Sequence, residues 1–168
     1  MKKNDSVKRL TFLSLCACVS LMLAYIESIM PSISGAVPGI KLGLANIMTV
    51  FVLYKYGLKS AAAVSFVRLT LSALLFGGVI SLMYGASGAL FSIAIMFLLK
   101  KTGAFSTVGV SIAGGVFHNL GQILLAMLML ETAGFGVYMA VLAVTGTVAG
   151  AFIGLASALM LKYTQKIY

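Results

Sequence analysis

The chain has 168 residues, of which 61% are hydrophobic and 9% are charged, and its formal net charge is +9. Twelve basic and three acidic residues cannot cover the surface of a soluble domain of this length, so the composition excludes a soluble globular protein. The basic residues lie beside apolar runs and form no face interleaved with aromatic rings, which argues against a nucleic-acid partner and for the lipid bilayer.

Charges, glycines and prolines divide the chain into apolar segments, which predict an all-α membrane protein with one domain over residues 1–168. The first segment runs without a polar break to Met30, so we interpret it as an uncleaved helix. Pro31 and Pro38 then predict a loop over residues 31–41. The six predicted transmembrane helices cover residues 10–30, 42–54, 58–82, 88–99, 104–130 and 137–161, with the break between the third and the fourth at residues 84–88.

The distribution of lysine and arginine predicts the orientation of these helices. Six helices with a cytoplasmic amino terminus put both termini and two of the connections inside, and ten of the twelve basic residues fall there. These ten are Lys2, Lys3, Lys8, Arg9, Lys55, Lys59, Lys100, Lys101, Lys162 and Lys166. The pattern predicts a multi-pass protein of the cytoplasmic (inner) membrane.

Arg68 and Lys41 are the two basic residues outside this pattern. Arg68 lies nine residues beyond Lys59, about 14 Å along the helix and near the middle of the bilayer. A charge at that depth costs at least about 2.5 kcal/mol, so Arg68 must face protein, water or an anionic ligand. Glu27, in the outer part of the first helix, is the alternative partner for Arg68 in an ion pair.

Further polar residues fall in the same outer half of the predicted bundle. His118 and Gln122 are four residues apart on one face of the fifth helix, with Asn119 close to that face. Asn46, four residues inside the outer end of the predicted second helix, lies at a similar depth. We predict a ligand-binding cavity that opens outward and is lined by Glu27, Lys41, Asn46, Arg68, His118, Asn119 and Gln122. The alternative is a set of hydrogen bonds between helices.

Small residues form stripes on two helices. Gly146, Gly150, Gly154 and Ala158 recur at every fourth position, and Ser14, Ala17, Ser20 and Ala24 give the first helix a similar face. Such stripes allow backbones to approach closely, either within the bundle or against a partner subunit.

No cofactor, metal site or catalytic site is expected. Cys16 and Cys18 point to nearly opposite sides of one helix, and His118 is the only histidine. The chain also has no ATP-binding motif, so any use of ATP must come from a partner.

Three stretches carry a family resemblance: Pro38–Asn46, Arg68 followed by Leu75–Gly78, and Ser111–Gln122. Together they resemble the Gx transporter family, also labelled heptaprenyl diphosphate synthase component I. The resemblance implies a six-helix bundle similar to the S components of energy-coupling-factor (ECF) importers of vitamins and their precursors. It also implies an outward cavity under the loop at residues 31–41, and partners that comprise a small-molecule ligand, a transmembrane coupling subunit and two ATPases.

The resemblance does not fit this chain at every point. The Ala-x-x-x-Ala docking motif of the first helix is absent in strict form, and Ser20-x-x-x-Ala24 is its candidate substitute. A prenyl synthase needs aspartate-rich motifs that hold magnesium, but Asp5 is the only aspartate. We therefore expect no catalysis. The alternatives to an importer component are a subunit or binding protein of isoprenoid or quinone metabolism, and an assembly subunit of a flavin-linked electron-transfer system.

Overall fold

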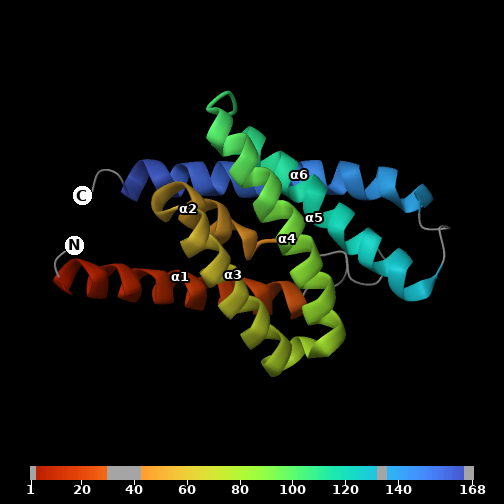
Figure 1. Ribbon diagram of the computed structural model, residues 1–168, viewed down its shortest axis with the longest axis horizontal. Coiled ribbons are helices and arrows are strands. Elements are labelled where there is room, and N and C mark those ends of the chain that lie inside the picture. The colour runs from red at the N-terminus through yellow and green to blue at the C-terminus, as the bar shows by residue number, and fades with distance from the viewer. Residues whose placement is uncertain (1–2, 30–42, 132–135, 165–168) are drawn as a thin grey trace.

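A computed structural model describes residues 3–29, 43–131 and 136–164, and this part of the chain is helical without a strand (Figure 1). In chain order the helices are α1 (Lys3–Ile29), α2 (Asn46–Tyr56), α3 (Leu58–Ser72), α4 (Gly78–Thr102), α5 (Thr107–Leu130) and α6 (Gly136–Thr164). A π-helical turn, η1 (Ala73–Gly77), joins α3 to α4. The prediction of an all-α protein is confirmed.

Four stretches of the described chain are long and apolar enough to cross a membrane, which indicates a multi-pass membrane protein. They are Asp5–Ile29, Leu58–Thr102, Thr107–Met129 and Met139–Thr164. Six separate spans are not shown, because α2 has only 11 residues and α3 and α4 belong to one stretch of 45 residues. Many large side chains of these stretches face outward, as lipid-exposed side chains do; Leu74 and Leu128 are 77% and 76% exposed.

The predicted break at residues 84–88 is wrong, and with it the predicted helices 58–82 and 88–99. The chain reverses earlier, at Gly77 and Gly78, where Gly78 has a φ of 70° that only glycine adopts easily. Helix α4 then runs unbroken through residues 84–88 to Thr102 (Figure 1). The glycines in this stretch allow close packing on two helices: an added Cβ at Gly85 would lie 2.7 Å from the side chain of Leu69 on α3, and one at Gly88 would lie 2.7 Å from the ring of His118 on α5.

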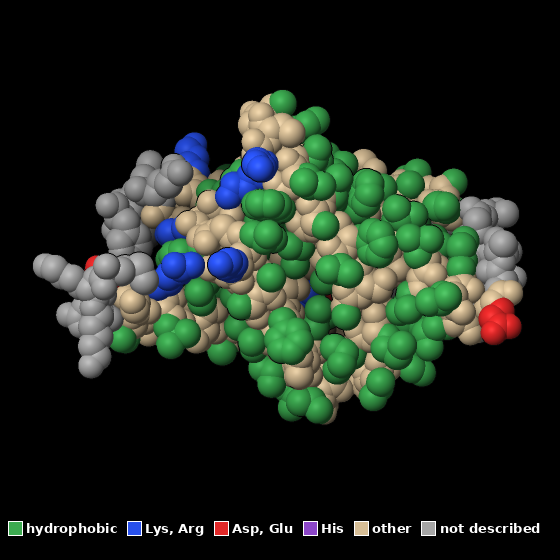
Figure 2. All heavy atoms as spheres, viewed as in Figure 1, with side chains coloured by type: hydrophobic (Ala, Val, Ile, Leu, Met, Phe, Trp, Pro, Cys, Tyr) green, Lys and Arg blue, Asp and Glu red, His purple; other side chains and the backbone are tan. Residues whose placement is uncertain are grey.

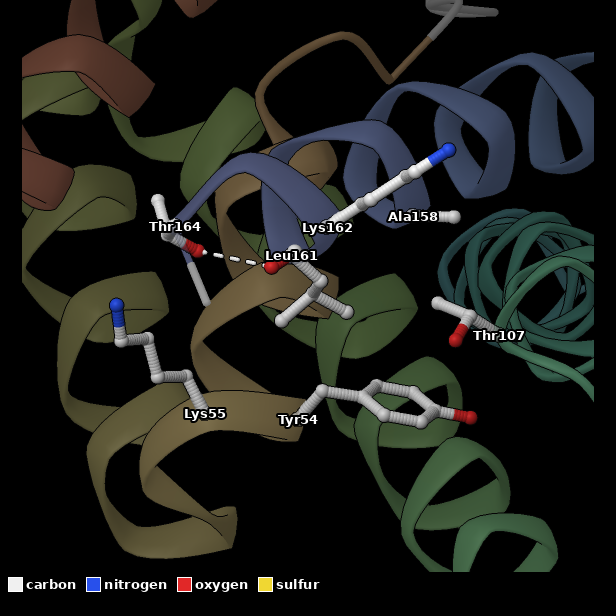
Figure 3. A pocket seen from close by; sticks show the side chains of 7 residues that line it. All are labelled: Tyr54, Lys55, Thr107, Ala158, Leu161, Lys162 and Thr164. Carbon is white, nitrogen blue, oxygen red and sulfur yellow. Dashed lines mark hydrogen bonds between the residues drawn. The ribbon is translucent and has the colours of Figure 1, made fainter. Parts of the chain in front are cut away.

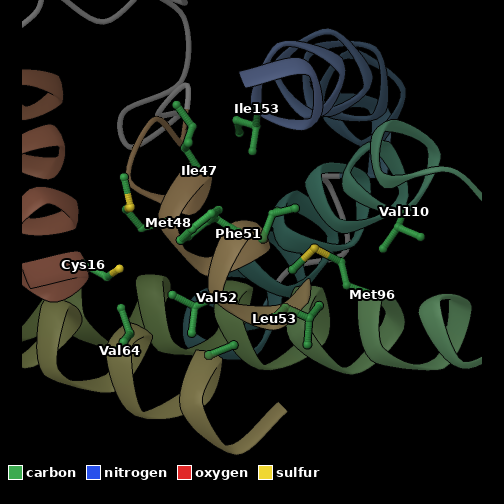
Figure 4. Close-up of a cluster of buried hydrophobic side chains, with 12 residues drawn as sticks. Cys16, Ile47, Met48, Phe51, Val52, Leu53, Val64, Met96, Val110 and Ile153 are labelled. Atoms are coloured by element: carbon green, nitrogen blue, oxygen red, sulfur yellow. The ribbon is translucent and has the colours of Figure 1, made fainter. Parts of the chain in front are cut away.

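Helix α2 forms the centre of the fold. Its residues 47–53 are all buried, and the apolar ones belong to one cluster that also contains side chains from each of the other five helices (Figure 4). Two buried serines hold its first turn: Ser20 on α1 donates to the carbonyl oxygen of Ala45 at 2.9 Å, and Ser157 on α6 donates to that of Ile47 at 3.0 Å. At its other end, Lys100 donates to the carbonyl oxygen of Leu53 at 2.7 Å.

The glycine stripe of α6 packs inside the bundle. A Cβ on Gly150 would lie 2.7 Å from the Cα of Ile112 and from the carbonyl oxygen of Ser111, both on α5. A Cβ on Gly154 would lie 2.8 Å from the Cα of Val108. The interpretation of this stripe as a packing surface is therefore confirmed, and α5 occupies the surface that a partner subunit would need.

The candidate docking pair on α1 is also occupied. Ser20 is fully buried and bonded to the residue before α2, and Ala24 is 8% exposed. These side chains face the protein interior, so Ser20-x-x-x-Ala24 cannot be the surface that docks a coupling subunit.

The basic side chains gather at one end of the molecule (Figure 2). Arg9 of α1 donates to Ser60 at 2.7 Å and lies over the ring of Tyr56 at 5.7 Å. Lys55 of α2 lies 5.1 Å from the centre of the Phe12 ring. These contacts join the start of α1 to the end of α2 and the start of α3, whereas α5 ends at the opposite end of the molecule (Figure 1).

Candidate functional site

Arg68 is the central residue of the polar cluster predicted from the sequence. It lies on α3, is 8% exposed, and its Nη2 donates to Oδ1 of Asn46 at 3.4 Å, which is long for a hydrogen bond. Its Nε is buried and has no hydrogen-bond partner among the described residues. A guanidinium carries five N–H donors, so Arg68 retains donors for a further acceptor.

Glu27 lies within electrostatic range of Arg68. Its carboxylate oxygen accepts a hydrogen bond from the backbone N–H of Gly43, just before α2. Gly43 has a φ of 75°, and a Cβ there would lie 3.0 Å from Nδ2 of Asn46. Helices α1, α2 and α3 therefore bring Glu27, Gly43, Asn46 and Arg68 together, and the proximity of Glu27 fits both an ion pair and a site that also takes a ligand.

His118 and Gln122 extend the cluster onto α5. The Nε2 atoms of the two side chains lie 3.2 Å apart, as their spacing of four residues predicts. The His118 ring packs on Gly88 of α4, where an added Cβ would lie 2.7 Å from the ring Cε1. Arg68 and His118 interact electrostatically, so the two sides of the cluster belong to one polar region.

Asn119 does not join this region. Its Nδ2 donates to the carbonyl oxygen of Leu142 on α6 at 2.8 Å, and the side chain is 6% exposed. Successive helical residues point about 100° apart, so Asn119 faces α6 while His118 faces α4. The structure thus gives Asn119 a contact between helices, and its role in ligand binding stays a prediction.

Lys41 and the predicted loop at residues 31–41 lie outside the described residues. Their place in the predicted cavity therefore stays a prediction as well.

Sequence reasoning missed two glycines of this site. Gly43 positions the N–H that Glu27 binds, and Gly88 makes room for the His118 ring. A hydrogen bond supports the same crossing of α4 and α5: Ser87 donates to the carbonyl oxygen of Gly121 at 2.7 Å. The small residues at 85–88 were visible in the sequence, but such a run also marks the end of a helix, and it was interpreted as a break.

The side chains of the cluster offer several hydrogen-bond donors. A buried guanidinium, an amide and an imidazole can donate to an anion or another electron-rich acceptor. No group of three or more His, Cys, Asp or Glu side chains in the described part of the chain could hold a metal ion.

Comparison with known proteins gives a family match. The family described as heptaprenyl diphosphate synthase component I matches residues 16–160, which covers α2 to α5 completely, the second half of α1 and most of α6. No curated protein and no solved structure matches the chain. Since the match extends over most of the sequence, the chain belongs to the heptaprenyl diphosphate synthase component I family.

Proposed function

We propose that this protein is the substrate-binding membrane component of an ECF-type importer in the cytoplasmic membrane. Its ligand is a small vitamin-like or precursor molecule with an anionic group. A transmembrane coupling subunit and two ATPases supply the energy for transport. The observation that carries the proposal is Arg68, a buried arginine whose Nη2 donates to Asn46 and whose Nε has no hydrogen-bond partner among the described residues.

The anionic nature of the ligand follows from the charges around Arg68. A buried charge needs compensation, and Glu27 is the acidic residue that interacts with Arg68. The carboxylate of Glu27 also accepts a hydrogen bond from the N–H of Gly43, so Arg68 is not its only neighbour. An anionic ligand would supply the remaining acceptors for Arg68, while Asn46 and His118 bind its polar atoms.

The test is mass spectrometry of the small molecules that co-purify with the protein in mild detergent. Arg68→Gln removes a charge-assisted hydrogen bond, which is worth about 1.5–3 kcal/mol, so we expect ligand retention to fall about 10- to 100-fold. Arg9→Gln is the matched control, since Arg9 lies at the basic end, bonded to Ser60. Equal retention by wild type and Arg68→Gln would contradict the assignment of Arg68.

The family description favours a second candidate function, a non-catalytic subunit or binding protein of isoprenoid or quinone metabolism. The same experiment separates the two. A polar or phosphorylated molecule present in wild type and lost from Arg68→Gln supports the importer component. A polyprenyl or quinone species retained by both supports the second function and leaves Arg68 as the partner of Glu27.

A further inference from the structure

Arg68 and Glu27 carry the formal charges of the candidate site. Of the acidic side chains in the described ranges, Glu27 is the one that interacts with Arg68, whereas Asp5 lies in the first turn of α1 and Glu131 follows the end of α5. The described lysines gather at the basic end of the molecule (Figure 2). Over the described part of the chain, the formal charges of the site therefore cancel.

A short path of contacts holds Glu27 near Arg68. The carboxylate of Glu27 accepts a hydrogen bond from the backbone N–H of Gly43. Gly43 lies against Asn46, since a Cβ at Gly43 would lie 3.0 Å from Nδ2 of Asn46. The Oδ1 atom of Asn46 accepts in turn from Nη2 of Arg68 at 3.4 Å. The carboxylate is thus bound to the backbone just before α2, close to the guanidinium.

An acidic group that binds Arg68 comes close to both of these charges. It gains charge-assisted hydrogen bonds from the guanidinium, while Glu27 repels it. A second negative charge on the same molecule is repelled by Glu27 as well, and the described residues offer it no further cation in this region. A buried charge without a partner is strongly unfavourable. Arg68 alone would favour the more highly charged acid, and Glu27 reverses that preference.

We infer that Glu27 limits the charge of the ligand, so that the site takes a singly charged acid, such as a carboxylic acid, in preference to a doubly charged one, such as a phosphate monoester. The inference rests on the proposed function, because it concerns the ligand that Arg68 binds. Glu27 is then a specificity-determining residue that acts by repulsion. Its carboxylate needs no contact with the ligand, so its hydrogen bond to Gly43 is compatible with this role.

The test compares malonamate with malonate, which have the same number of heavy atoms and differ by one negative charge at mildly alkaline pH. Each acid is titrated into the full-length protein in mild detergent, and its affinity follows from the rise in Tm, because a ligand of the folded state stabilises that state. A maleimide dye that reacts with the buried Cys16 reports unfolding in a Cys18→Ser background. Wild type should bind malonamate more tightly than malonate, and Arg68→Gln should lose both responses.

Glu27→Gln removes the repulsion and keeps a side-chain oxygen that can accept from Gly43. Each negative charge a few ångströms from Glu27 should then bind about tenfold better, so the affinity should rise about 10-fold for malonamate and about 100-fold for malonate. A general loss of stability would lower the Tm in the absence of either acid, but it would leave the ratio of the two affinities unchanged. The ratio therefore isolates the effect of the charge.

Two control variants remove a charge elsewhere. Glu131→Gln removes an exposed carboxylate at the end of α5. Lys162→Gln removes the exposed lysine of a groove of about 510 Å³ that lies between α2, α5 and α6 at the basic end (Figure 3). Neither variant should change the ratio of the affinities for malonamate and malonate.

This inference and the proposed function fail in different ways. A wild type that prefers malonate, or an unchanged ratio in Glu27→Gln, overturns the inference, while a loss of response in Arg68→Gln still supports the proposed function. A phosphorylated molecule that co-purifies with wild type and is lost from Arg68→Gln also overturns the inference alone. Equal responses of wild type, Glu27→Gln and Arg68→Gln contradict both.

Discussion

The crossing of α5 and α6 leaves no room for a side chain at Gly150, so Gly150→Ala should destabilise the protein. The added methyl group would lie 2.7 Å from the backbone of Ile112 and of Ser111, and backbone atoms cannot move aside as the end of a flexible side chain does. Overpacking of this kind costs about 1–3 kcal/mol. Alanine regains up to about 1 kcal/mol of helix propensity, so the expected net loss is about 1–2 kcal/mol.

A cysteine-reactive maleimide dye can follow thermal unfolding in detergent, because the chain has no tryptophan. Cys16 is buried in the core beside α2, whereas Cys18 is exposed. In a Cys18→Ser background the dye therefore reacts only when the core opens. For a domain of this size the expected loss corresponds to a fall in Tm of roughly 2–8 °C.

Gly109→Ala is the matched control on the same pair of helices. A Cβ at Gly109 would lie 3.6 Å from Oγ of Ser106, which is an ordinary contact. We expect its Tm to stay unchanged or to rise. If Gly150→Ala were as stable as Gly109→Ala, the close approach of α5 and α6 would be refuted.

Two further predictions concern the ends of α2. Ser157→Ala removes the donor to the buried carbonyl oxygen of Ile47, so the free energy of unfolding should fall by about 0.5–1.5 kcal/mol in the same dye assay. An unchanged Tm would mean that water or another donor replaces the serine. Lys100→Met removes the donor to the carbonyl oxygen of Leu53 and should lower the Tm, whereas Lys101→Met, at an exposed position, should not. Equal effects of the two substitutions would show that the charge at this end matters and the hydrogen bond does not.

The sequence predicts the class of fold because its signals are strong where helices meet lipid. Apolar runs and flanking lysines located the helices, with α1 and α6 extending beyond their predicted limits of 10–30 and 137–161. The start of α5 was predicted at residue 104, but Ser106 caps the helix by accepting from the N–H of Gly109 at 3.2 Å. That cap was readable in the sequence as a serine just before an apolar run.

The turn between α3 and α4 could not be chosen from the sequence, because two glycine pairs compete for it. Gly77 and Gly78 make the turn, whereas Gly85 and Gly88 allow packing on neighbouring side chains. Both uses need a residue without a side chain, so composition alone does not distinguish them. Only the packing of α4 against α3 and α5, a tertiary feature, decides between them.

The candidate site was partly predictable for a similar reason. Charge at membrane depth singled out Arg68, and a spacing of four residues paired His118 with Gln122. The direction of Asn119 depends on which helix lies beside α5 at that level, and the link from Glu27 to Gly43 is made by a backbone N–H that no side-chain pattern reveals.

Helix α2 connects the candidate binding site to the core of the fold. Asn46 begins α2 beside Arg68, and the buried residues 47–53 follow it directly. Because α2 belongs to the central cluster of buried side chains, substitutions on it would disturb the core together with the site. Arg68 lies on α3, so variants at this position test binding with less effect on the core. Loss of ligand with Cys16 still protected from the dye then separates a binding defect from a folding defect.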